Sequence, residues 1–136
     1  MEDNSQELQV NWYAVKLLFE SIHSGNPILI PNENDQQHYA NNEKLFEESI
    51  ILVKAITMKQ AYEIAEDLAK KSEHEYFNVY GELVKWQFVS ILHSFELNDK
   101  ELAPGTEIYS RFIHAKRDNN INDIIMRYYP EALDTK

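Results

Sequence analysis

Residues 11–22 read Asn-Trp-Tyr-Ala-Val-Lys-Leu-Leu-Phe-Glu-Ser-Ile, and their pattern predicts the strand on which the expected fold depends. Every second position holds a large apolar side chain, in the order Tyr13, Val15, Leu17 and Phe19. A period of two places these side chains on one face of a β-strand. The positions between them mix apolar and charged residues, namely Trp12, Ala14, Lys16, Leu18 and Glu20. We therefore predict a strand with one fully buried face and one mixed face.

A second strand and a helix follow after a polar stretch. Residues 49–55 read Ser-Ile-Ile-Leu-Val-Lys-Ala, a nearly continuous apolar run that is typical of a central strand. Thr57 and Gln60 have the spacing of a capping box, which marks the start of a helix. Behind them an apolar stripe recurs at helical spacing, formed by Ala61, Ile64, Ala65 and Leu68. We expect this helix to pack on one face of the sheet.

The region 76–114 predicts three further strands. Residues 76–79 and 83–97 flank a turn at Gly81 and form a hairpin. Two apolar sets occupy opposite faces of the longer strand, Val84, Trp86 and Phe88 on one and Val89, Ile91 and Phe95 on the other. This switch of phase predicts a β-bulge or a bend. Residues 106–114 follow a Pro-Gly turn and return as a strand, with Ile108, Ser110 and Phe112 expected to point inward.

The last predicted element is a helix over residues 121–129, which stops before Pro130. The order of elements is β-β-α-β-β-β-α, which contains few strand-helix-strand units and therefore predicts an α+β fold. We expect a mainly antiparallel sheet of about five strands, with one helix packed on it and a C-terminal helix. Residues 1–10 are predicted to be a disordered acidic N-terminus, and residues 11–136 a single domain with a long loop at 24–44.

Length, charge and cysteine content narrow the classes of function. The chain has 136 residues, which fits one domain, and a formal net charge of −10, which argues against nucleic-acid binding. It contains no cysteine, which suits a reducing compartment. No apolar run is long enough to cross a membrane. We therefore expect a cytoplasmic protein that contacts neither nucleic acid nor membrane.

Negative charge is concentrated in the first part of the chain. Residues 1–50 hold nine acidic side chains against two lysines, a net charge of −7, whereas residues 51–136 carry the remaining −3. Charge gathered in one part of a surface attracts a cationic partner and speeds association. Acidity that serves only solubility is the alternative, and it stays open at this stage.

No motif for catalysis, a metal ion or a cofactor stands out. The five histidines lack the spacings that bring two imidazoles together, and three glycines cannot build a phosphate-binding loop. We therefore expect no enzymatic activity, no metal and no cofactor. The nearest approach to an acid–base site is Glu73-His74-Glu75, but adjacent side chains diverge on a strand or at a helix end.

Four stretches carry a resemblance to a known family. They are Asn-Trp-Tyr-Ala-Val-Lys-Leu-Leu-Phe-Glu at 11–20, Leu-Phe-Glu-Glu-Ser-Ile at 45–50, Asn-Val-Tyr-Gly-Glu-Leu-Val-Lys-Trp-Gln-Phe-Val at 78–89 and Gly-Thr-Glu-Ile-Tyr-Ser-Arg at 105–111. Together they resemble a bacterial family, domain of unknown function 4288, over residues 11–113. The Trp-x-Phe strand of that family corresponds to Trp86 and Phe88, and its Gly-Thr-Glu turn to residues 105–107. The resemblance implies a shared fold unit, with no established activity and no catalytic residue.

Our first functional hypothesis is a non-enzymatic acidic protein that binds and neutralises a basic protein partner. Small size, concentrated negative charge and many aromatic residues suit a surface that is complementary in charge and tightly docked. Immunity proteins, antitoxins and anti-defence proteins work in this way against nuclease toxins or defence proteins. The expected contact residues lie in and after the long loop: Glu33, Asp35, Tyr39, Glu43, Glu47 and Glu48.

The alternative hypothesis is a domain that binds a small anionic ligand. An aromatic pocket would be formed by Trp12, Trp86 and Tyr109, with Arg111 as the residue that holds the anion. Self-association as a homodimer is a further expectation, because strand edges and an apolar C-terminal helix can pair across a two-fold axis.

Overall fold

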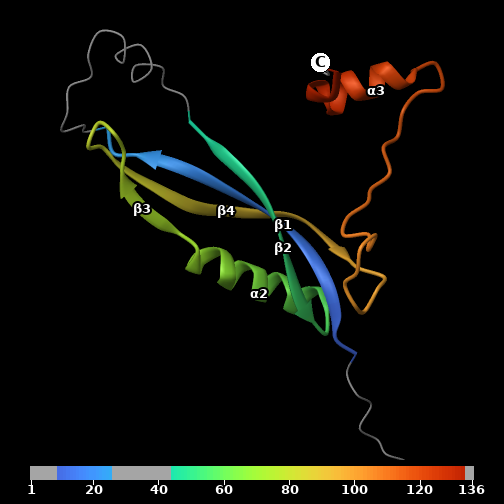
Figure 1. Ribbon diagram of the computed structural model, residues 1–136, viewed down its shortest axis with the longest axis horizontal. Helices are drawn as coiled ribbons and strands as arrows, with labels where there is room; N and C mark the ends of the chain where they lie inside the picture. The colour runs from blue at the N-terminus through green and yellow to red at the C-terminus, as the bar shows by residue number, and fades with distance from the viewer. Residues whose placement is uncertain (1–8, 26–43, 134–136) are drawn as a thin grey trace, which may run out of the picture.

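β1 (Asn11–His23) is the central element of a four-stranded antiparallel sheet with strand order β2-β1-β4-β3 (Figure 1). β2 (Phe46–Ala55) pairs with one edge of β1 and β4 (Leu83–Glu96) with the other. The short β3 (His74–Phe77) pairs with the first residues of β4. The computed structural model describes residues 9–25 and 44–133, so most of the expected N-terminal tail and long loop lies outside the described residues. The α+β class with a mainly antiparallel sheet is confirmed.

One helix, α2 (Met58–Lys71), covers one face of the sheet. Its start is the predicted one, because the side chain of Thr57 accepts a hydrogen bond from the backbone N–H of Gln60 at 3.1 Å. The side chain of Gln60 reaches back to the N–H of Ile56 at 2.7 Å. Small residues make the contact with the sheet, and Ala61, Ala65 and Ala69 are almost completely buried.

The core lies between α2 and one face of β1, the face that the alternation of apolar residues predicted to be buried. Tyr13, Val15, Leu17 and Phe19 are all buried there, together with Val53 and Ala55 of β2. Trp86, Phe88 and Ile91 of β4 pack against this cluster. We call this side of the sheet the helix-covered face, and the opposite side the open face.

β4 contains register shifts of the kind predicted from its apolar residues, which switch from one face of the strand to the other. Its register against β1 shifts twice, between Lys16 and Leu17 and between Leu18 and Phe19. Phe19 therefore faces Phe88 while Leu17 faces Ile91, so that both β4 residues lie on the helix-covered face despite their odd spacing. Bulges of this kind bend a strand and increase its twist.

Two strand predictions were wrong. β2 is an edge strand of the described sheet, because β1 occupies the centre and β4 takes its other side. Residues 106–114 form no strand, and they pair with neither edge of the described sheet. Phe112, which we expected to point inward, is 93% exposed, and Tyr109 is instead the residue that packs on the sheet. The sheet thus has four strands where about five were expected.

The C-terminal residues leave the sheet. After β4 the chain runs without regular structure to α3 (Ile121–Tyr128) and the short 3-10 helix η1 (Pro130–Leu133). Among the described elements α3 packs only against η1, and Figure 1 shows it standing apart from the sheet. Neither helix of the described chain has the length and apolar character that crossing a membrane requires.

A buried carboxylate closes the end of the sheet opposite the start of α2. Glu82 is only 3% exposed, and its oxygens contact Nδ1 of His23 at 3.0 Å and the backbone N–H of Gly25 at 2.8 Å. The amide of Asn78 donates to the same carboxylate at 3.2 Å. These bonds tie the end of β1 to the turn between β3 and β4, and they satisfy a charge that would otherwise be costly to bury.

Replacing Ala65 by leucine tests the close approach of α2 to the sheet. Because Ala65 is 0% exposed, Ala65→Leu forces the helix outward and should lower the free energy of unfolding by about 1–3 kcal/mol. The exposed Glu63→Leu on the same helix should change it by no more than about 0.5 kcal/mol. Urea unfolding followed by circular dichroism measures both, and equal stability of the two variants would contradict this packing.

Candidate functional site

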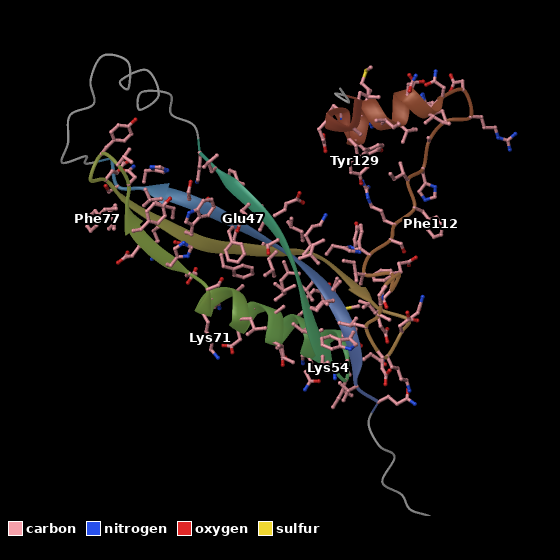
Figure 2. All side chains as sticks on the ribbon, in the orientation of Figure 1. Glu47, Lys54, Lys71, Phe77, Phe112 and Tyr129 are labelled. Atoms are coloured by element: carbon pink, nitrogen blue, oxygen red, sulfur yellow. The ribbon has the colours of Figure 1, made fainter. Side chains whose placement is uncertain are left out.

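A cleft of about 590 Å³ opens between the C-terminal half of α2 and the helix-covered face of the sheet. Its walls are mainly apolar and come from five elements and the connection after α2: Leu17 and Phe19 of β1, Glu47, Ser49 and Ile51 of β2, Leu68 and Ala69 of α2, Ser72 of the connection, His74 of β3 and Trp86 of β4. In Figure 2, Glu47 lies on the sheet and Lys71 at the end of α2, the two elements that form the sides of the cleft. An apolar cleft with a few polar groups is the usual form of a binding site.

Glu47 brings a negative charge to this apolar surface. It lies on the helix-covered face because it is paired with Phe19 in the register of β1 and β2. No ion pair within residues 9–25 and 44–133 includes Glu47. Among these residues nothing neutralises the carboxylate, and a cation that enters the cleft meets it at the wall.

His74 and Ser72 are held in place at the opposite wall. The hydroxyl of Ser72 donates to the carbonyl oxygen of Ala69 at 2.7 Å, at the C-terminal end of α2. Nδ1 of His74 lies 3.1 Å from the carbonyl oxygen of Ser72, and because a carbonyl can only accept, Nδ1 carries the proton. In the neutral ring this leaves Nε2 as an acceptor. The cleft thus offers a carboxylate and an imidazole acceptor.

The side chains of Glu73, His74 and Glu75, the nearest approach to an acid–base site in the sequence, point in different directions. Glu73 is the residue before β3. Its carboxylate accepts a hydrogen bond from the backbone N–H of Phe88 at 2.9 Å. Glu75 points to the other face of the sheet from His74, as neighbours on a strand must. Across the residues that the structure describes, no three acidic or histidine side chains are close enough to hold a metal ion.

The six residues expected to contact a partner divide into three groups. Glu33, Asp35, Tyr39 and Glu43 lie outside the described residues. Glu47 lines the cleft. Glu48 points to the open face, where Lys16 contacts it at 3.5 Å. Consecutive strand positions alternate between faces, so Glu47 and Glu48 serve different surfaces.

The four residues expected to form an anion pocket are not brought together. Trp86 lines the cleft on the helix-covered face, whereas Trp12 lies on the open face with Lys54 over its ring at 4.8 Å. Tyr109 packs against His93 and Phe95 on the open face. Arg111 turns away from the sheet and donates a hydrogen bond to the hydroxyl of Tyr129 at 3.1 Å.

Sequence reasoning missed that Glu47, His74 and Trp86 share one cleft. Their relation depends on the pairing of β3 with β4, in which His74 is the partner of Trp86. One signal was available, because Glu47 is in phase with Ser49, Ile51 and Val53 and therefore belongs to the buried side of its strand. The contribution of Leu68 and Ser72 from α2 follows only from the position of the helix.

Comparison with known proteins gives one match. A family model described as Domain of unknown function (DUF4288) matches residues 12–110. This confirms the resemblance noted in the sequence, and the match covers the sheet and α2 but not α3. No curated protein and no solved structure matches the chain.

A small amphipathic cation provides a direct test of the cleft. The chain has two tryptophans, so in the Trp12→Phe variant all tryptophan emission comes from Trp86. Benzylamine should bind with its ring on the apolar wall and its ammonium group at Glu47, and should change that emission in a saturable way. The change should be lost when Glu47→Gln is added and kept when Glu48→Gln is added. Equal responses of the two variants would contradict the role of Glu47.

Proposed function

We propose that this chain, which belongs to the family of domain of unknown function 4288, is an acidic interaction protein that binds and neutralises a basic protein partner. The observation that carries the proposal is the carboxylate of Glu47, which has no ion-pair partner among the described residues and lies in an open apolar cleft. Immunity proteins, antitoxins and anti-defence proteins are the classes that work in this way. We place its action in the cytoplasm, as its lack of cysteine supports.

The chemistry of the cleft suits a lysine or arginine side chain of the partner. The apolar stem of such a side chain packs on Leu68 and Trp86, and its cationic end reaches the carboxylate of Glu47. A cation over the indole ring of Trp86 is stabilised further by a cation–π interaction. Nε2 of His74 adds an acceptor for an N–H donor.

The charge of the chain supports the same partner class. Its net charge of −10 attracts a basic protein over a distance of about one Debye length, which is about 8 Å at physiological salt. The first 50 residues account for −7 of this charge, and Glu47 lies at the end of that acidic part. Steering by the acidic part would bring a basic partner toward the cleft.

A charge reversal at Glu47 tests the proposal with a matched control on the neighbouring residue. Immobilised wild-type protein should retain a basic protein from a lysate of cells that naturally express the chain, at both low and moderate salt. Glu47→Lys should reduce retention by at least about tenfold, because it places a like charge at the contact. Glu48→Lys makes the same change one residue away on the open face and should retain the partner. If Glu47→Lys retained as much of the basic protein as the wild type does, the proposal would be contradicted.

A second candidate function, the binding of a small anionic ligand, has one observation in its favour. A separate cleft of about 430 Å³ near α3 is lined by His114, Lys116, Arg127 and Tyr128, among others. Arg111 stacks on the ring of Tyr128 at 5.3 Å, and its hydrogen bond to Tyr129 raises the pKa of Arg111 above its ordinary value. Lys116 and Arg127 thus offer an anion hydrogen-bond donors in this cleft, whereas Arg111, the residue expected from the sequence, is not one of its lining residues.

Inorganic phosphate tests this second candidate. It should raise the Tm of the wild type, since a ligand that binds only the folded state stabilises it. The increase should disappear in Arg127→Gln, which changes a residue lining the cleft near α3, and persist in Arg117→Gln, which does not. Differential scanning fluorimetry measures the shift, and the same shift in all three proteins would count against an anion site there.

A further inference from the structure

The C-terminal arm, residues 111–133, exposes an unusual set of side chains. It contains all three arginines of the chain. Its apolar residues are poorly covered, with Phe112 at 93%, Ile121 at 77% and Met126 at 64% exposure, and no residue of α3 is buried. Phe112 and Tyr129 can be seen on the arm in Figure 2, away from the sheet. Arginine, tyrosine and methionine together are typical of protein interfaces.

The arm is ordered by its own contacts and not by the sheet. Arg111 and Arg127 both lie over the ring of Tyr128, at 5.3 and 5.5 Å. A complete capping box at Asn120 and Asp123 begins α3. A helix of eight residues is marginal in water without a packing partner, so its amphipathic face needs a surface to cover it.

The open face of the sheet lacks a cover in the described part of the chain. Four apolar residues lie there on adjacent strands: Leu18 of β1, and Phe46, Ile50 and Leu52 of β2. The three on β2 are 55%, 42% and 37% exposed. The neighbouring part of this face is covered by Tyr109, which packs on Phe95 and His93 with Lys16 over its ring, and Lys44 lies over the ring of Phe46 at 5.4 Å. An antiparallel sheet can leave one face to water, but that face is then usually polar.

We propose that the arm of one copy docks on the open face of a second copy, and that the exchange is reciprocal across a two-fold axis. Tyr109, which precedes the arm, packs on the open face, so the arm begins beside the surface that needs a cover. In its own chain α3 packs against none of the four described strands, and in Figure 1 it lies away from the sheet. A second copy supplies both a packing surface for α3 and a cover for the open face, since every chain carries one arm and one open face.

Charge favours a second copy as the occupant. The arm has four basic and three acidic residues, a net charge of +1, whereas the described residues outside it, 9–25 and 44–110, hold 13 acidic and eight basic residues, a net charge of −5. On the open face the side chain of Glu48 is 63% exposed, and its one ion pair with a described residue is a 3.5 Å contact with Lys16, which leaves room for an arginine of the arm. Two reciprocal contacts also bury twice the area that a single arm would bury.

The dimer and the proposed binding of a basic partner use opposite faces of the sheet. The arm covers the open face, while the cleft with Glu47 lies on the helix-covered face and stays accessible. The dimer would therefore present two clefts, which raises the apparent affinity for a partner with two basic sites. Either proposal can fail without the other.

Light scattering coupled to size exclusion tests the exchange on the full chain. The wild type should have twice the mass of the 16.0 kDa chain. Ile50→Glu on the open face and Ile121→Glu on the arm should each give a monomer, because both place a charge in the contact. Val79→Glu changes an equally apolar residue, 80% exposed in the turn between β3 and β4, and should remain a dimer. All three positions are exposed, so circular dichroism should show the same folded sheet in each.

A mixture of the two monomeric variants distinguishes the arm-to-face contact from other dimers. An equal mixture of Ile50→Glu and Ile121→Glu should recover a dimer, because the heterodimer retains one intact arm on one intact face. A monomeric wild type would overturn the proposal. So would a dimer that survives either single substitution, or a mixture that stays monomeric, since these results indicate no dimer or one built from two arms or two faces.

Discussion

The rest of the structure depends on β1, which pairs along most of its length with strands on both sides. Ten residues of β1 pair with β2 and eleven with β4, so its backbone groups are satisfied within the sheet. The side chains of β1 then divide between two faces with different environments. One face is apolar and meets α2, whereas the other mixes charged and apolar residues and carries none of the described helices (Figure 1).

The position of α2 explains why a cleft exists on the helix-covered face. Alanines at 61, 65 and 69 let the helix approach the sheet closely, because small side chains bring two backbones together. The bulges of β4 twist the sheet, and a straight helix cannot follow a strongly twisted surface over its whole length. Space therefore remains beside the end of α2, where Leu68 is still 45% exposed, and Glu47 and Trp86 reach it from the sheet.

The two faces present different chemistry to other molecules. The helix-covered face offers an apolar cleft with a carboxylate, which suits a single cationic side chain. The open face offers a broader apolar surface that suits the packing of another element, such as an amphipathic helix. Among the described elements one helix, α2, covers one face, and the arm that could cover the other leaves the sheet instead, as Figure 1 shows.

The sequence by itself determined the elements whose signals are local. The period of two in β1, the cap at Thr57 with the alanine stripe behind it, and the switch of apolar phase in β4 each correspond to a feature of the structure, because alternation and capping depend only on near neighbours. The tertiary structure alone decided that β2 lies at an edge, that residues 106–114 form no strand, and that Trp12 and Trp86 lie on opposite faces. A strand exists only if another strand offers its hydrogen bonds, and a site exists only if distant segments meet. Both conditions are set by pairing between residues far apart in the chain, which no local pattern encodes.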